Sequence, residues 1–353
     1  MVPIPESGMV TASSSARDPE GLNRMNVLIT GGGGFLGWLL AGELLRRGRL
    51  VGPGGEEEIG ELRLLDQGFA RPLNDPRVVA VTGDVGDREQ VFAAVGSGAD
   101  AATAIFHLAS MVSGECELRF EDALRVNLDG GRHLFEAARG VPGRSRLVFA
   151  SSIACFGGDE VAFPFSDRSK LLPQTTYGMT KAICELMVND YSRKGFFDGR
   201  SARLPTVIIR PGRPNAAASS WASGMFREPL AGEPCELPVR VDQPHPMTGY
   251  RTVIDSLIRL FELPEARLGC DRAVGLPAHR VTPRDAETAL RQVAEEGSRR
   301  LGPIVATPDP RIQQIVDGWA TEIDGTRAIG LGLPQPPPLI EIIRHYLSDF
   351  GTG

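Results

Sequence analysis

The sequence predicts an α/β protein with a doubly wound parallel sheet and a smaller C-terminal α/β domain. From residue 25 onward, short apolar runs alternate with stretches of helical spacing, and a glycine-rich segment follows the first apolar run. Alternating strands and helices form right-handed βαβ units, whose helices cover both faces of a parallel sheet. Beyond residue 211 the periodicity weakens while proline and glycine become more frequent. We therefore expect one domain at 25–210 and a second, smaller one mainly at 211–353, with an interwoven boundary.

The individual elements follow from apolar spacing and from the residues that end each run. Strands are expected where short apolar runs stop at glycine or polar residues, and helices where apolar residues recur every three to four positions. The predicted strands lie at 25–30, 61–66, 77–82, 103–108, 146–151 and 203–210. The predicted helices lie at 35–47, 87–95, 118–139, 176–194, 251–262, 283–296, 310–318 and 337–349. We expect residues 48–60 to form an irregular insertion and residues 1–24, which are rich in Ser, Pro, Gly and Glu, to form a disordered tail.

Composition excludes several classes of function. The chain has 353 residues and a formal net charge of −6, with no run of Lys or Arg to follow a phosphate backbone, so we expect no nucleic-acid partner. No apolar run approaches the roughly 20 residues needed to cross a bilayer, so we expect no membrane segment. The five cysteines are scattered and the five histidines lack metal-ligand spacing, which indicates a cytoplasmic protein without a metal site.

A phosphate-binding loop is predicted between the first strand and the first helix. Gly31, Gly34 and Gly37 form a G-x-x-G-x-x-G pattern at this turn. The pattern lets the backbone turn tightly, approach a pyrophosphate without interference from Cβ atoms, and present the N–H groups of a helix N-terminus to the anion. A glycine-rich turn without a ligand is the alternative. The position on the first βα turn favours a dinucleotide site.

Acidic residues after the second and third strands bear on which dinucleotide is bound. Asp66 ends the second predicted strand, where a carboxylate accepts hydrogen bonds from both ribose hydroxyls and repels a 2′-phosphate. It lies further from the glycines than is usual, and the insertion at 48–60 accounts for the delay. The pattern favours NAD over NADP, with a solvated aspartate at a strand end as the alternative. Asp84 and Val85 are placed to contact the adenine, or else form only a turn.

A Y-x-x-x-K pair, Tyr177 and Lys181, lies on the long helix predicted at 176–194. At this spacing both side chains leave the same face of a helix, about 6 Å apart along its axis. A nearby cation stabilises tyrosinate, and lowering the pKa of a tyrosine from about 10 to near 7 takes about 4 kcal/mol. Ser152 follows the strand at 146–151, at the edge where open parallel sheets bind ligands. These residues predict a site in which Ser152 holds a substrate oxygen and Tyr177 moves its proton.

Five motifs together resemble the extended short-chain dehydrogenase/reductase family, which includes NAD-dependent epimerases and dehydratases. They are Thr30–Gly37, His107–Ser110, Asn127, Ala150–Ser152 and Tyr177–Lys181, and the resemblance covers about residues 25–350. It implies a Rossmann domain followed by a substrate domain, with Ser152, Tyr177 and Lys181 as the catalytic triad. The NAD contacts that it implies are Gly31, Gly34, Phe35, Leu36, Gly37, Asp66, Asp84, Val85, Leu108, Ala109, Asn127, Tyr177, Lys181 and Pro205.

A narrower resemblance rests on the segments 173–177, 189–193, 203–215 and 216–230. They are similar to the D-erythronate dehydrogenase group, whose members oxidise the C2 hydroxyl of a four-carbon sugar acid to a 2-oxo acid. The resemblance implies a small-molecule substrate that is held from both domains. The substrate contacts expected from it are Ser110, Ser113 and Ser152 in the first domain, and Asn215, Ser219, Ser220 and Arg227 in the second.

Two other functions remain open. Six arginines lie between residues 203 and 251, and arginine binds carboxylates and phosphates with the same fork of donors, so their density does not separate a sugar acid from a nucleotide sugar. The first alternative is therefore a UDP-hexose-type epimerase or dehydratase that retains its NAD. The second is a catalytically idle NAD-binding protein, against which the complete Ser, Tyr and Lys set argues. The resemblance also implies a C2 homodimer formed by the helices at 118–139 and 176–194.

Overall fold

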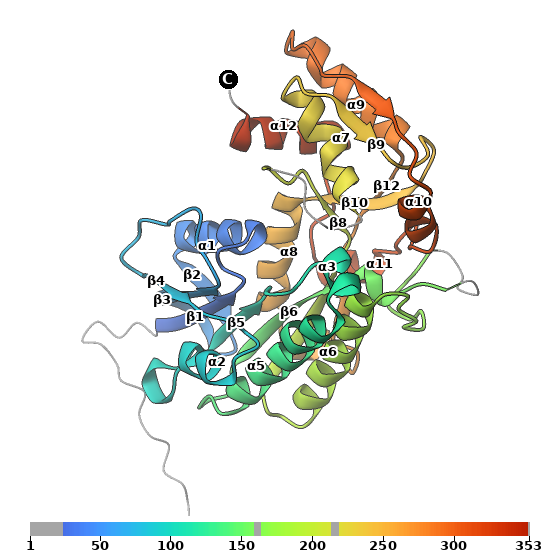
Figure 1. Ribbon diagram of the computed structural model, residues 1–353. Helices are drawn as coiled ribbons and strands as arrows, with labels where there is room; N and C mark the ends of the chain where they lie inside the picture. The colour runs from blue at the N-terminus through green and yellow to red at the C-terminus, as the bar shows by residue number, and fades with distance from the viewer. Residues whose placement is uncertain (1–23, 159–163, 213–218, 352–353) are drawn as a thin grey trace, which may run out of the picture.

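The computed structural model describes residues 24–158, 164–212 and 219–351, and its centre is a sheet flanked by helices (Figure 1). The sheet has eight strands in the order β11-β7-β6-β5-β1-β3, with β2 and β4 both paired to β3. All strand pairs are parallel except β2 with β3. The strands are β1 (Arg24–Thr30), β2 (Arg49–Gly52), β3 (Gly55–Asp66), β4 (Val78–Thr82), β5 (Ala104–His107), β6 (Arg146–Ser152), β7 (Asp198–Leu204) and β11 (Ala273–Gly275). This topology confirms the predicted α/β class with a Rossmann-type sheet.

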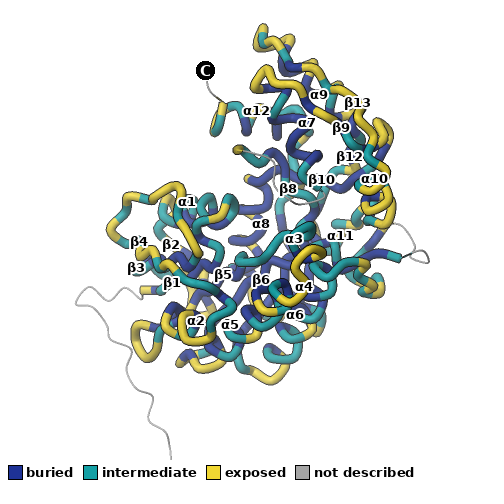
Figure 2. The backbone as a smooth tube through the Cα atoms, viewed as in Figure 1, coloured by how far each residue is buried: buried dark blue, intermediate teal, exposed yellow. Residues whose placement is uncertain are grey.

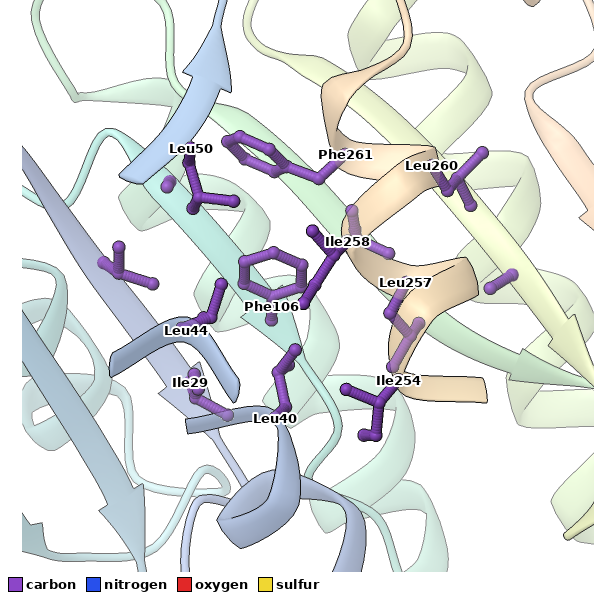
Figure 3. Close-up of a cluster of buried hydrophobic side chains, with 14 of the residues drawn as sticks. Ile29, Leu40, Leu44, Leu50, Phe106, Ile254, Leu257, Ile258, Leu260 and Phe261 are labelled. Atoms are coloured by element: carbon purple, nitrogen blue, oxygen red, sulfur yellow. The ribbon is translucent and has the colours of Figure 1, made fainter. Parts of the chain in front are cut away.

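Apolar residues alternate along the strands and give the sheet two buried faces. In β1, Val27 and Ile29 belong to one apolar cluster and Leu28 belongs to the other. The first face is covered by α1 (Phe35–Arg47) and α8 (Tyr250–Glu262), whose side chains meet around Phe106 of β5 (Figure 3). The second face is covered by α2 (Arg88–Val95), α5 (Gly130–Arg139) and α6 (Thr176–Arg193). Figure 2 shows β5 and β6 as buried segments between these helices.

The chain from residue 206 onward builds a second part and also returns to the first. The core of the second part gathers around a three-stranded sheet, β12-β10-β8, and a two-stranded sheet, β13-β9. Its elements are β8 (Thr206–Ile208), α7 (Ser220–Leu230), β9 (Cys235–Leu237), β10 (His245–Gly249), β12 (His279–Val281), α9 (Pro283–Glu296), β13 (Ile304–Ala306), α10 (Pro310–Asp317) and α12 (Leu339–Phe350). Helix α11 (Thr326–Leu331) instead packs on the first apolar cluster, beside β11. Because β11 pairs with β7 and α8 covers the central sheet, this half of the chain contributes to both parts.

Three predicted elements differ in the structure. The expected insertion at 48–60 is a hairpin, in which β2 runs antiparallel to the start of β3 and buries Leu50 against the core. The predicted helix at 118–139 is divided into the end of α3 (Ser113–Leu118), α4 (Phe120–Ala123), a π-helical segment (Leu124–Asp129) and α5. The last predicted strand, at 203–210, is divided between the end of β7 (Asp198–Leu204) and a strand of another sheet at Thr206–Ile208. The start of β7 was missed because the buried pair of Asp198 with Arg200 gives it a charged sequence without the usual apolar pattern.

Two further expectations from the sequence concern the N-terminal tail and membrane-spanning segments. The predicted tail at 1–24 lies outside the described residues except for Arg24, which begins β1. Within the described ranges, no helix has the length and the apolar character needed to cross a membrane.

Candidate active site

A cavity of about 740 Å³ lies at the carboxyl ends of the parallel strands, between the central sheet and the second part of the chain. Its walls come from the loop after β1, the segments after β5 and β6, the start of α6, and α7 with the residues after β8. Open parallel sheets bind ligands at this edge, where loops from neighbouring strands converge. The cavity therefore collects the groups that the sequence places at strand ends.

The loop between β1 and α1 is packed so closely that several of its glycines leave no room for a side chain. Gly31 has a φ of +75°, and a Cβ there would lie 2.7 Å from the amide nitrogen of Ala109. A Cβ on Gly37 would lie 2.0 Å from the carbonyl oxygen of Gly31. Helix α1 begins after Gly34 without a side-chain cap, so the N–H groups of residues 35–37 have no acceptor within the helix. This loop fits the pyrophosphate of a dinucleotide, which needs free N–H donors and a close approach to the backbone.

Two acidic side chains near this loop have partners within the protein. Asp66 ends β3, and its Oδ2 accepts a hydrogen bond of 3.0 Å from the N–H of Gly33. Its carboxylate therefore supports the glycine loop, and its contact with a ribose stays a prediction. Asp84 accepts hydrogen bonds from the N–H of Gly86 and from Arg125, both at 2.8 Å. The Asp84 side chain therefore shapes the turn after β4.

Ser152, Tyr177 and Lys181 line the cavity together. Tyr177 and Lys181 lie one turn apart on α6, and Nζ of Lys181 is 5.5 Å from the centre of the Tyr177 ring. Burial raises the pKa of Tyr177 above its ordinary value, and a hydrogen bond with the Ser152 hydroxyl partly offsets this effect. Tyrosinate at neutral pH therefore requires additional positive charge beside the phenol.

Lys181 is the buried cation of this group. It is 3% exposed, its Nζ donates to the carbonyl oxygen of Ala150 at 2.8 Å, and it lies 4.8 Å from the centre of the Phe149 ring. Burial lowers the pKa of Lys181 to about 8. Because an ammonium group has three donors, the bond to Ala150 leaves others for Tyr177 or a ligand. A lysine that changes charge near neutral pH beside a tyrosine is suited to proton transfer.

A buried chain of charges next to Lys181 has no signal in the sequence. Glu185, one turn further along α6, accepts hydrogen bonds from the Ser151 hydroxyl at 2.5 Å and from Nη2 of Arg203 at 2.8 Å. Arg203, near the end of β7, also pairs with Asp167 at 3.1 Å. The partners lie 18 to 36 residues apart, so no local motif marks them.

Asn127 lies in the π-helical segment and supports one wall of the cavity. Its Oδ1 accepts the N–H of Met111 at 2.7 Å, and its Nδ2 donates to the Met111 carbonyl oxygen at 3.3 Å. This two-point contact holds the segment after β5, from which Ser110 and Ser113 line the cavity. Asn127 therefore acts on the site indirectly, by holding the backbone segment that carries these serines.

The structure brings most of the predicted site residues to this one cavity. Its lining includes Gly31, Gly34, Phe35, Leu36, Gly37, Leu108, Ser110, Ser113, Ser152, Tyr177, Lys181, Pro205, Ser219, Ser220 and Arg227. Among the described residues, Asp66, Asp84, Val85, Ala109 and Asn127 do not line it. Asn215 lies outside the described residues. The individual roles of these residues stay predictions.

Four further polar residues line the cavity from the second part: Thr206, Arg210, Ser223 and His245. Arg210 is one of the six arginines between residues 203 and 251, and their density alone did not distinguish it. Thr206 and His245 share a hydrogen bond of 2.6 Å. The two residues are 39 positions apart, so no local motif predicts this contact.

Comparison with known proteins finds a matching family model, similar sequences and a similar solved structure. The family model described as "NAD dependent epimerase/dehydratase family" matches residues 27–243. The chain is 42% identical to D-erythronate dehydrogenase of Cupriavidus necator, over 93% of this chain and 100% of that protein. It is 36% identical to D-erythronate dehydrogenase of Haemophilus influenzae, over 92% of this chain and 99% of that protein. A crystal structure titled as a nucleoside-diphosphate-sugar epimerase from Agrobacterium tumefaciens superposes with a TM-score of 0.83 at 36% identity, covering 96% of this chain and 98% of that one.

Gly37→Ala tests whether the glycine loop binds a dinucleotide as its packing suggests. The added methyl group would collide with the Gly31 carbonyl oxygen, and overpacking of about 1–3 kcal/mol should displace the loop and lower NAD affinity at least about tenfold. Gly42→Ala is the matched control, because Gly42 lies in the same helix and has no atom within 4 Å of an added Cβ. Calorimetric titration with NAD measures both variants, and equal affinities would contradict the assignment.

Proposed function

The chain belongs to the NAD-dependent epimerase/dehydratase family and is an NAD-dependent oxidoreductase, and we propose that it oxidises D-erythronate or a close four-carbon aldonate at C2. The product is then the corresponding 2-oxo acid. Two D-erythronate dehydrogenases that match nearly the whole chain support this choice of substrate. We also propose the cytoplasm as the location of the enzyme, which suits its five free thiols.

The residues of the cavity divide the reaction between them. Ser152 holds the oxygen of the C2 hydroxyl, and Tyr177 takes the hydroxyl proton while the hydrogen on C2 leaves as a hydride. Bound NAD would supply the hydride acceptor, held at the glycine loop of residues 31–37. The charge of Lys181 favours the deprotonated form of Tyr177. A fixed carboxylate keeps C2 oriented toward these groups, which is where much of the rate gain from a bound substrate originates.

The proposal depends on one observation: a single cavity of about 740 Å³ contains the dinucleotide loop, the Ser–Tyr–Lys group and arginine side chains. Pockets of about 300–1,000 Å³ usually bind one drug-sized ligand. With a dinucleotide in place, the space that remains suits a compact acid better than a second nucleotide. The solved structure titled as a nucleoside-diphosphate-sugar epimerase makes nucleotide-sugar epimerisation the second candidate.

A panel of four- to six-carbon aldonates, each mixed with NAD and the purified protein, tests the proposed reaction. We expect D-erythronate to give NADH and 2-oxo-tetronate in equal amounts. Tyr177→Phe keeps the ring and loses only the acid/base oxygen, so it should lose nearly all turnover and retain NAD affinity. Tyr191→Phe, on the same helix with its hydroxyl bonded to Glu136, should stay active. Inert aldonates together with an epimerised UDP-sugar would replace the proposal with the second candidate.

Lys181→Met tests the role of the buried cation through the pH profile. Oxidation needs deprotonated Tyr177, so kcat/KM at saturating NAD falls as the pH drops below the pKa of this residue in the complex. Loss of the nearby charge raises that pKa, and the acidic limb should move up by at least about 1 pH unit. Because the pKa of Lys181 is about 8, the two profiles should differ most below that pH, where the wild-type ammonium is charged.

Lys194→Met is the control for this experiment, since it removes an exposed lysine from the end of the same helix. Its profile should coincide with that of the wild type. If the Lys181→Met profile also coincides with the wild type, Lys181 does not stabilise the tyrosinate.

We propose that the protein forms a C2 homodimer through the outer surface of α3, α4 and α6. Leu118, Phe120 and Leu186 are 82%, 49% and 60% exposed on these helices, and α3 and α4 both contact α6. Exposed apolar groups gathered in this way mark contact surfaces. Leu186→Lys should therefore give a monomer in light scattering, whereas Ile315→Lys, on the distant helix α10, should not. A wild-type protein that is monomeric at micromolar concentration would contradict the dimer.

A further inference from the structure

The arginines between residues 203 and 251 differ in whether a carboxylate neutralises them. Arg203, Arg227, Arg240 and Arg251 pair with Glu185, Glu228, Asp317 and Asp349, respectively. Arg213 lies outside the described residues. Arg210 is half-buried in the wall of the cavity, and within the described part of the chain no carboxylate lies within ion-pair distance of it. It is therefore the arginine in this segment whose guanidinium can accept an external anion without first losing an internal partner.

The backbone of Arg210 is held by helix α7 at both of its polar groups. Its N–H donates to Oγ of Ser223 at 3.2 Å, and its carbonyl oxygen accepts from Nη1 of Arg227 at 3.0 Å. Burial, together with the charge of Arg227, lowers the pKa of Arg210, and a bound anion would relieve both effects. Arg227 itself is committed to this carbonyl oxygen and to Glu228, so it supports Arg210. A guanidinium on a fixed backbone is preorganised for a carboxylate.

A second donor in the same wall is Thr206, whose orientation depends on His245. Nε2 of His245 lies 2.6 Å from Oγ1 of Thr206, and Nδ1 of His245 has no hydrogen-bond partner. The imidazole is 2% exposed, with the rings of Trp221 and Trp319 at 5.7 Å and 5.4 Å. Burial lowers the pKa of His245 to about 4, so the ring is neutral at physiological pH.

A neutral imidazole carries one N–H. The nitrogen that carries it decides whether the Thr206 hydroxyl donates a hydrogen bond to the ring or accepts one from it. With the hydrogen on Nδ1, a buried donor is left without an acceptor, and with the hydrogen on Nε2, the lone pair of Nδ1 is left without a donor, so the unpaired atom selects neither form. A carboxylate beside Thr206 favours the form with the hydrogen on Nε2, in which the ring donates to the oxygen of Thr206. The hydroxyl hydrogen of Thr206 is then free to donate to a ligand in the cavity.

We infer that Arg210 and Thr206 form the subsite that binds the substrate carboxylate, with the Arg210 guanidinium paired to the carboxylate and the Thr206 hydroxyl donating to one of its oxygens. His245 is a positioning residue that acts through Thr206. This inference rests on the proposed function, which requires an acid beside the carbon that is oxidised. It assigns the carboxylate to a guanidinium that follows β8, whereas sequence resemblance pointed to Arg227.

Two substrates that differ only in charge test the role of Arg210: D-erythronate and its uncharged amide. In Arg210→Gln, we expect kcat/KM for the acid to fall roughly 100-fold, because a desolvated charge pair loses one member, while the value for the amide changes by less than about threefold. Arg210→Lys should lie between the two, since lysine keeps the charge and loses the two-pronged geometry. Arg240→Gln, which removes an exposed arginine paired to Asp317, is the matched control and should behave as the wild type.

Binding and a second pair of variants separate recognition from folding. Calorimetric titration of D-erythronate into the enzyme with NADH should show the same loss for Arg210→Gln, and thermal melting confirms that each variant is folded. Thr206→Val should lower kcat/KM for the acid about tenfold through the loss of one hydrogen bond to a charged group. Thr206→Ser keeps the hydroxyl and should restore it, which a purely structural role of the threonine methyl group would not allow.

The possible failures are distinguishable. If the wild type oxidises D-erythronate and Arg210→Gln keeps the wild-type preference for the acid over the amide, the carboxylate subsite is wrong and the proposed function stands. If the wild type oxidises no aldonate, the proposed function fails and the subsite fails with it. If Thr206→Ser is as impaired as Thr206→Val, Thr206 is removed from the subsite.

Discussion

The architecture of the site depends on one buried ion pair, between Glu185 of α6 and Arg203 near the end of β7. Glu185 is 1% exposed and Arg203 is 3% exposed, so protein groups alone compensate the two charges. Removing one member of such a pair leaves the other buried and uncompensated, which costs about 3–5 kcal/mol. Arg203 also forms an ion pair with Asp167, and Asp167 forms a second ion pair with Arg327 of α11 at 3.0 Å. One chain of charges therefore joins α6, the central sheet and α11.

The same ion pair fixes the position of α6 relative to the end of β6, and with it the distance between the proposed reacting groups. Tyr177 lies two turns and Lys181 one turn before Glu185 on a single helix. Ser151, the neighbour of Ser152 at the end of β6, donates its hydroxyl to the same carboxylate. Because helix and strand meet at one buried carboxylate, the spacing of Ser152 and Tyr177 is determined by rigid elements and not by a loop. Precise placement of reacting groups requires this kind of support.

Features that depend on neighbouring residues were predictable from the sequence, and features that depend on distant partners were not. The glycine loop and the pair of Tyr177 and Lys181 are defined by spacing within a few residues, so the fold and these parts of the site followed from the sequence. Arg210 resembles Arg240 in sequence, and the difference is that the folded chain brings Asp317 to Arg240 from 77 residues away. The start of β7 was misplaced because its charged residues are buried with partners that the sequence does not reveal.

The return of the C-terminal half to the central sheet has a consequence for how the protein is made. Strand β7 has its outer neighbour only when β11 is in place, and one face of the sheet is apolar until Ile254, Leu257 and Phe261 of α8 cover it. During translation, most of the Rossmann part therefore leaves the ribosome with an open strand edge and an uncovered face, the two features that most promote aggregation. A fragment that ends before α8 would retain both. The dinucleotide-binding part is thus not a module that folds ahead of the rest, and its folding is completed late in synthesis, when the chain returns to it.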